Sequence, residues 1–148
     1  AIWGAILPER HQVEQSAHID SPPKKVWRVI TDYERTPRWR SRLTETRRHA
    51  SPAGHPLWVE IYEGGQRVVF ETTAAEPPHR LVRRVRQSNM SFSGRWEFRL
   101  RPAGGGTQVV LTEHGRMANP VVRFISTYLL GRTTAVERYL TDLRRFLS

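Results

Sequence analysis

Six consecutive strand-like segments, joined by short connections, are the feature that most restricts how this chain can fold. The segments are 43–50, 57–63, 66–75, 80–87, 93–102 and 107–116. The connections read SPAGHP, EGG, EPPH, SNMS and AGGG, and residues of these types are typical of turns. Strands that are joined by turns this short pair in opposite directions. The sequence therefore predicts an antiparallel sheet.

The segment 93–102 shows the clearest alternation, because apolar residues occupy every second position. Its apolar residues Trp96, Phe98 and Leu100 alternate with Arg95, Glu97, Arg99 and Arg101. This pattern predicts a strand with one buried face and one face in water. The glycine-rich stretch 103–107 follows it and lacks the Gly-Lys-Ser/Thr ending of a phosphate-binding loop. We therefore expect a hairpin turn there.

Two short helices are expected between a first strand and these segments. Residues 11–20 alternate loosely and predict that first strand. Asp20 or Ser21 is expected to cap the helix that follows, whose first turn contains two prolines. A second helical turn is expected over about 34–41 and is opened by Pro37, which would break a longer helix.

The last part of the chain, from Asn119 or Pro120 to about Leu147, predicts one long amphipathic helix. Its apolar residues recur at steps of three and four: Val122, Ile125, Leu129, Val136, Tyr139, Leu140, Leu143 and Phe146. Gly131 interrupts the pattern and indicates a kink or a close contact. A long terminal helix laid across a curved antiparallel sheet is an α+β arrangement.

Composition restricts the classes of function. The chain has 148 residues, which suits one domain, and it has no cysteine, which excludes disulfides, thiol nucleophiles and cysteine zinc sites. The net charge is +10, which can indicate a nucleic-acid or anionic-membrane partner. The arginines are spread along the chain, however, which favours ordinary solvated strand faces. No recognition helix or RNA-binding motif is visible, so no nucleic-acid partner is expected.

The first eight residues, AIWGAILP, form an apolar segment with two open interpretations. The segment is too short to span a bilayer, which needs about 20 residues, and it lacks the charged start of a signal peptide. It can be the remnant of a membrane anchor that lies upstream of Ala1, or an ordinary segment that packs on the domain. The localisation is accordingly either cytoplasmic or membrane-anchored with a soluble domain.

Several short phrases resemble a known superfamily. They are Ile19, Ser21-Pro22, Val26-Trp27, Asp32-Tyr33 and Pro37-Arg38-Trp39. In this order they resemble the START-like, birch-pollen-allergen-like superfamily (SRPBCC), which includes polyketide cyclases/dehydrases and lipid-transport proteins. The strand pair 93–116 and the stretch GRTTAVERYLTDL (131–143) look like a bacterial branch of it. The resemblance covers about residues 9–148 and is more specific for fold than for function.

The resemblance implies a helix-grip fold over residues 9–148. In that fold a seven-stranded curved antiparallel sheet surrounds a long C-terminal helix, and two short helices follow the first strand. A cavity for an apolar or aromatic small molecule is expected between sheet and helix, with Trp27 anchoring the first helix and Trp39 closing one end. Similar bacterial chains often carry a hydrophobic segment before a phrase like Leu7-Pro8-Glu9-Arg10-His11, which favours the membrane-anchor interpretation.

A cavity of this kind needs apolar walls and a few polar groups that orient the ligand. The residues expected to line it are Trp39, Trp58, Glu60, Tyr62, Phe70, Trp96, Phe98, Arg123 and Tyr128. Glu60 and Tyr62 share one parity of their strand and are expected to share one face. Parity alone does not decide which face of so curved a sheet is directed inward.

Two functions remain open, and both use the same cavity. The first is binding or transport of a hydrophobic small molecule, such as a lipid, a polyketide or an aromatic compound. The alternative is a polyketide cyclase/aromatase or a dehydratase, in which Glu71, Glu113 or His114 supplies the acid-base group. No metal site or cofactor is expected, because the histidines form no HxxxH or HExxH pattern. The identity of the ligand and the oligomeric state stay open.

Overall fold

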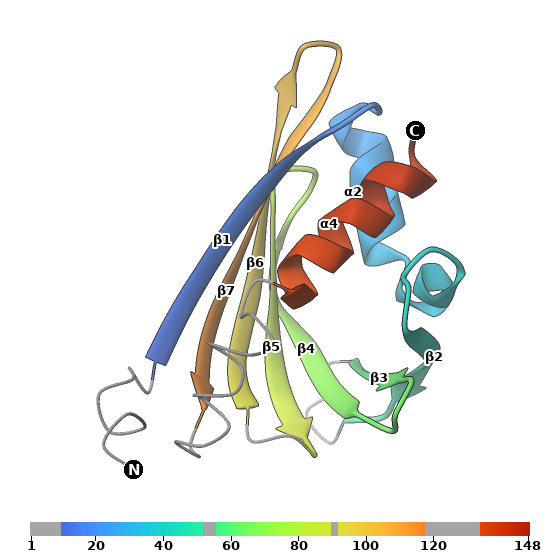
Figure 1. Ribbon diagram of the computed structural model, residues 1–148, viewed down its shortest axis with the longest axis vertical. Helices are drawn as coiled ribbons and strands as arrows, with labels where there is room; N and C mark the ends of the chain where they lie inside the picture. Colours follow the sequence, from blue (N-terminus) through green and yellow to red (C-terminus); the bar gives the residue numbers. More distant parts are fainter. Residues whose placement is uncertain (1–9, 52–55, 90–91, 118–133) are drawn as a thin grey trace.

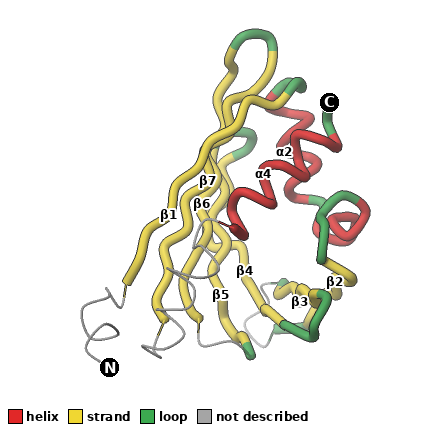
Figure 2. Tube along the Cα trace, in the orientation of Figure 1, coloured by secondary structure: helices red, strands yellow, loops and turns green. Residues whose placement is uncertain are grey.

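The computed structural model describes residues 10–51, 56–89, 92–117 and 134–148 (Figure 1). Its strands form one seven-stranded antiparallel sheet in the order β1-β7-β6-β5-β4-β3-β2. The strands are β1 (Arg10–Ile19), β2 (Leu43–His49), β3 (Leu57–Tyr62), β4 (Arg67–Glu76), β5 (Arg80–Ser88), β6 (Phe92–Ala103) and β7 (Gly106–Met117). The sheet is curved, and the helices lie on its concave side (Figures 1 and 2).

Strand β6 has the predicted alternation. Phe98 and Leu100 are buried in the core, while the carboxylate of Glu97, on the opposite face, accepts a hydrogen bond from Arg80 Nε at 2.6 Å. The predicted hairpin is also confirmed, because Ala103 pairs with Gly106 across a two-residue turn. Gly104 and Gly105 occupy the turn with φ of +52° and +81°, values that side chains rarely tolerate at two successive positions.

The two short helices follow β1 as expected, with different details at their ends. Helix α2 (Pro23–Thr31) begins after Pro22, and no side chain caps it, so the expected cap at Asp20 or Ser21 is wrong. Ser21 is instead buried, and its carbonyl accepts a hydrogen bond from Thr107 Oγ1 at 2.7 Å. The second helix, η1 (Tyr33–Arg38), is a 3₁₀ helix that contains Pro37 rather than starting with it.

Helix α4 (Thr134–Phe146) lies against β1 and β7 on the concave side of the sheet (Figure 1). Its buried apolar residues Val136, Tyr139, Leu140 and Leu143 follow the predicted helical spacing. Phe146, expected on the same face, is instead 50% exposed, and the next residue, Leu147, is buried in its place. The buried residues pack with Ile19, Phe98 and Leu111 in one hydrophobic core. Burial of each large apolar side chain contributes about 1.5–3 kcal/mol, so this face holds the helix on the sheet.

The arrangement is the predicted α+β helix-grip fold. Residues 118–133, where the earlier part of the long helix and Gly131 were expected, lie outside the described residues, as does the apolar segment 1–8. No helix in the described ranges is long and apolar enough to cross a membrane.

Candidate functional site

A buried group of charged residues lies on the inner face of the sheet. Glu60 Oε2 accepts hydrogen bonds from Arg40 Nη1 at 2.8 Å and from Arg83 Nη2 at 2.9 Å. Tyr62 donates its hydroxyl to the other oxygen, Glu60 Oε1, at 2.6 Å. Arg40 and Arg83 side chains are each only 7% exposed, and Glu60 is 5% exposed. We call Arg40, Glu60, Tyr62 and Arg83 the arginine cluster.

Strand geometry explains three of the inward positions. Glu60 and Tyr62 are two residues apart on β3 and therefore share one face, as the sequence predicted. Arg83 lies opposite Trp96 of β6 in the sheet register, and Leu81, two positions earlier on the same face, is fully buried. The alternation of β5 therefore places an arginine at a core-facing position.

Arg40 reaches the cluster from the connection between η1 and β2. The next residue, Ser41, donates its backbone N–H (2.7 Å) and its hydroxyl (2.9 Å) to Asp142 Oδ2 of helix α4. Asp142 is buried, and hydrogen bonds to a charged acceptor are among the stronger ones in proteins. Helix α4 thereby holds the backbone that carries Arg40.

Aromatic rings surround both guanidinium groups. The Cζ atom of Arg83 lies 3.7 Å from the ring centroid of Phe70, and that of Arg40 lies 4.8 Å from the ring centroid of Tyr139. Tyr139 is in turn in contact with Trp96, at 5.5 Å between ring centroids, and with Trp39, at 5.1 Å. Cations close to aromatic faces are stabilised by the ring quadrupole, most strongly where water is excluded.

The electrostatics keep the cluster ionised. Burial on its own would raise the pKa of the Glu60 carboxyl, but the charges of Arg83 and Arg40 outweigh it and hold this pKa below its usual value. Burial raises the pKa of the Tyr62 and Tyr139 hydroxyls, so both stay protonated. Two guanidinium groups and one carboxylate therefore leave one formal positive charge within the cluster.

Three buried polar atoms at this site have no hydrogen-bond partner among the described residues. They are Arg40 Nε, Arg83 Nε and the hydroxyl of Tyr139. An unsatisfied buried polar group costs about 1–3 kcal/mol, which makes such groups uncommon in folded proteins. Three of them around one cluster indicate that this region is suited to a further hydrogen-bonding group.

A second polar contact lies on the same face. Trp96 Nε1 donates to Glu113 Oε2 at 2.6 Å, and Glu113 is buried at 7% exposure. Glu113 lies opposite Trp96 in the register of β6 and β7 and shares a face with the buried Leu111. Of the three candidate acid-base residues, the structure places Glu113 on the inner face.

The other two candidates lie on the outer face. Glu71 is next to the inward-facing Phe70 on β4 and accepts a hydrogen bond from Arg86 Nη2. His114 is next to Glu113 and lies opposite Arg95 in the register of β6 and β7. The structure therefore does not bring Glu71, Glu113 and His114 together.

The expected aromatic lining residues fall into two groups. Trp39, Trp96 and Phe98 surround Tyr139 of α4, and Phe98 is completely buried in the core. Trp58 and Phe70 instead both contact Tyr33 of η1, with ring centroids 5.5 and 5.2 Å away. Trp58, Tyr62 and Trp96 remain half-buried, so part of each stays accessible beside the cluster.

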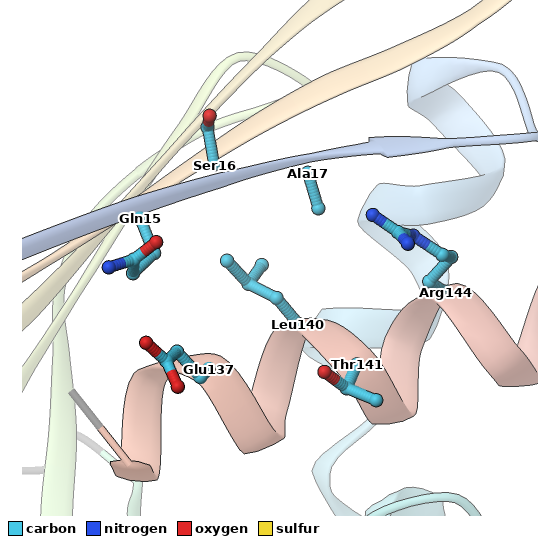
Figure 3. Close-up of a pocket in the computed structure, with 7 residues that line it drawn as sticks. All are labelled: Gln15, Ser16, Ala17, Glu137, Leu140, Thr141 and Arg144. Atoms are coloured by element: carbon cyan, nitrogen blue, oxygen red, sulfur yellow. The ribbon is translucent and has the colours of Figure 1, made fainter.

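The two remaining lining candidates, Arg123 and Tyr128, lie outside the described residues. A hollow does lie between the sheet and the C-terminal helix, where the ligand cavity was expected. It has a volume of about 120 Å³ and lies between β1 and α4, where Ala17 and Leu140 point toward each other (Figure 3). Pockets for small organic ligands usually measure about 300–1,000 Å³, so this surface groove is too small for a lipid or a polyketide.

The sequence predicted Glu60 and Tyr62 as site residues but missed Arg40, Arg83 and Tyr139. Arg83 shares its parity with Leu81 and Val85, and this apolar–Arg–apolar spacing is the signal that could have identified it. The helical spacing assigns Tyr139 to the apolar face of the last helix, where it is expected only to pack. No local pattern around Arg40 indicates an inward side chain.

Comparisons with solved structures show the same fold. An aromatase/cyclase, Zhui, from Streptomyces sp. R1128 superposes with a TM-score of 0.77 at 13% identity, covering 93% of each chain. A START superfamily protein from Mycobacterium smegmatis gives 0.75 at 14% identity, covering 93% of this chain and 97% of the other. A protein from Thermus thermophilus gives 0.73 at 22% identity, with the same two coverages.

Sequence comparison gives the family. Among curated proteins, none matches this sequence significantly. A family model described as "Polyketide cyclase / dehydrase and lipid transport" matches residues 10–147, which is almost the whole chain. Proteins of this description act on or carry hydrophobic small molecules, and the START-type fold agrees with the match. The chain belongs to the polyketide cyclase/dehydrase and lipid transport family.

Proposed function

We propose that this protein binds or carries a hydrophobic small molecule on the concave side of its sheet, beside the arginine cluster. The ligand contacts the half-buried rings of Trp58, Tyr62 and Trp96 and is oriented by the polar groups next to them. Ligand sites of this type combine apolar walls with a few convergent polar groups.

One observation carries the proposal. On the inner face, accessible aromatic side chains adjoin buried polar atoms that have no partner among the described residues. A folded interior normally satisfies its polar groups, and accessible aromatic side chains gathered beside a few polar groups are typical of ligand sites. A ligand with an apolar body and a polar end supplies what both kinds of group lack.

A neutral fluorescent probe, N-phenyl-1-naphthylamine, tests the proposal. We expect a saturable rise in its fluorescence with the wild-type protein, because the probe moves from water into an apolar site. In ¹H–¹⁵N spectra its binding is expected to shift the indole N–H signals of Trp58 and Trp96. The signal of Trp27 on α2 serves as the internal control and is expected to stay in place.

Two results would contradict the proposed binding function. The proposal is wrong if the probe and a panel of lipids, polyketides and aromatic compounds all fail to bind folded protein. It is also wrong if the probe binds but shifts Trp27 and leaves both Trp58 and Trp96 unchanged.

A second candidate function is catalysis in the same site. The observation in its favour is Glu113, a buried carboxylate on the inner face that is held by Trp96 Nε1. A carboxyl in this place can act as the acid-base group of a cyclisation or dehydration. Incubation with poly-β-ketone compounds, followed by mass spectrometry for loss of water, tests it. Glu113→Gln should abolish the product and still bind the probe.

A further inference from the structure

We propose that the bound molecule is a hydrophobic acid whose carboxylate is held by Arg40 and Arg83 next to the Tyr139 hydroxyl. This inference rests on the proposed binding function and specifies the class of ligand. It follows from the charge of the arginine cluster and from the identity of its unpartnered atoms.

Arg40 and Arg83 together carry more positive charge than the carboxylate of Glu60 neutralises. Among the described residues, the one carboxylate that forms ion pairs with Arg40 and Arg83 is that of Glu60, and both arginines are almost fully buried. A buried charge without compensation is costly, because neighbouring water cannot solvate it. A second carboxylate would balance the two guanidinium groups, whereas a neutral ligand would leave the excess positive charge in place.

The hydrogen bonds of Glu60 leave one donor of each arginine without a partner among the described residues. Both arginines donate to the same oxygen, Oε2, and Tyr62 already donates to Oε1. Each arginine uses one terminal nitrogen for this contact, and its Nε is left without a partner among the described residues. The carboxylate of Glu60 is thus engaged at both oxygens while the two Nε donors are not served by it.

The three atoms that lack a partner among the described residues can all donate a hydrogen bond. Arg40 Nε and Arg83 Nε can only donate, and the Tyr139 hydroxyl is kept protonated by burial and can donate as well. Three donors require an acceptor. A carboxylate has two oxygens with about four acceptor positions, so one group can serve several of these donors.

The side chains around the two guanidinium groups indicate what the rest of the ligand is like. Around the guanidinium groups lie the rings of Phe70, Tyr139 and Trp96, so the surroundings of the carboxylate are apolar and aromatic. A small inorganic anion would balance the charge but leave the half-buried ring of Trp96 uncovered. A carboxylate attached to an apolar or aromatic body satisfies both.

Matched pairs of compounds test the inference with the wild-type protein. Decanoic acid is compared with decanamide, and 2-naphthoic acid with 2-naphthamide, by displacement of N-phenyl-1-naphthylamine at neutral pH. Each pair has the same body, and both members carry an acceptor oxygen, so they differ mainly in charge. We expect the acid to bind about tenfold more tightly than its amide in at least one pair, the effect of one charged hydrogen bond.

A matched pair of variants locates the effect. Arg83→Lys keeps the charge but loses the planar donor arrangement, and it should reduce the acid preference several-fold. Arg84→Lys, at the neighbouring outward position, should leave that preference unchanged. If Arg83→Lys does not fold, the ¹H–¹⁵N signals of the arginine Nε groups in the wild type give the same information. Acid, but not amide, should shift the signals of Arg40 and Arg83.

The outcomes separate the two proposals. If acids and amides bind equally in both pairs, or acids bind without shifting either Nε signal, the acid inference is overturned and the binding function stands. If neither the neutral probe nor any of the four compounds binds to folded protein, the binding function itself is overturned. Preference for the acid that survives unchanged in a folded Arg83→Lys variant also contradicts the assignment to Arg83.

Discussion

Arg83 and Arg84 are neighbours on β5 and have opposite environments. Arg83 is directed inward, is buried, and contacts both Glu60 and the ring of Phe70. Arg84 is exposed on the outer face opposite Arg95 of β6, and it forms no ion pair within the part of the chain that the structure describes. The alternation of β5 therefore places Arg83 in the interior and Arg84 in water, so the two arginines contribute differently to stability.

The comparison extends to the ion pairs of the two faces. On the outer face Arg80 contacts Glu76 and Glu97, and the side chains of Arg80 and Glu76 are 37% and 61% exposed. Such pairs are screened by water and salt and contribute little to stability. On the inner face the same types of group are removed from water, so the loss of one partner leaves a buried charge behind. The inner and outer arginines should therefore respond very differently to substitution.

The largest expected effect is that of Glu60→Gln. This change removes the only carboxylate that the arginine cluster contains and leaves two buried guanidinium groups unbalanced. We expect the free energy of unfolding to fall by about 3–5 kcal/mol, measured by urea denaturation. Glu76→Gln on the outer face is the control and should cause no measurable change. Equal effects of the two variants would contradict the contrast between the faces.

Arg83→Met should have a smaller effect, because Glu60 remains paired with Arg40. We expect a loss of about 2 kcal/mol, from one charged hydrogen bond and the contact with Phe70. Arg84→Met is the matched control at the next residue and should leave the unfolding curve unchanged. A larger loss for Arg84→Met than for Arg83→Met would show that the inward and outward assignments on β5 are wrong.

Asp142→Asn tests the contact that holds the Arg40 connection to α4. The neutral side chain weakens the two hydrogen bonds from Ser41, so we expect a loss of about 1 kcal/mol in stability. The Nε signal of Arg40 should also shift, because its backbone is less firmly placed. Glu137→Gln, an exposed change on the same helix, is the control for both measurements. An unchanged Arg40 signal in folded Asp142→Asn protein would remove this role of α4.

The smallest expected effect is the dependence on pH. The pKa of Glu60 is lower in the folded protein than in the unfolded chain, where a glutamate has a pKa of about 4.3. Its stabilising contribution is therefore complete above the unfolded pKa and is lost as the pH falls through the folded pKa. The stability difference between wild type and Glu60→Gln should narrow as the pH is lowered below about 4.3. A difference that stays constant or widens with acid would contradict the lowered pKa.

The regular parts of the fold could be predicted because they follow from local patterns. The alternation of Trp96, Phe98 and Leu100 and the glycine turn after them required no knowledge of the rest of the molecule. The same holds for the helical spacing of Val136, Tyr139 and Leu143, which are all buried. The alternation and the helical spacing each repeat over several residues, so one exceptional residue does not obscure the predicted strand or helix.

The arginine cluster could be predicted only in part. Glu60 and Tyr62 were identified through their shared parity, but their partners Arg40 and Arg83 lie 20 and 23 residues from Glu60 in sequence. Inward arginines contradict the usual assumption that charged residues face water. Two register shifts between β4 and β5, one of them between Val69 and Phe70, also change which residues of the two strands share a face, and no sequence rule fixes them.

We infer that the inner arginines, Arg40 and Arg83, bind the carboxylate of a ligand, whereas the outer Arg84 does not. The most direct measurement is the ¹H–¹⁵N spectrum of the arginine Nε groups of wild-type protein during titration with 2-naphthoic acid. We predict saturable shifts of the Arg40 and Arg83 signals that 2-naphthamide does not reproduce, with Arg84 unchanged. Saturable binding of the acid that leaves the Arg40 and Arg83 signals in place would contradict the claim.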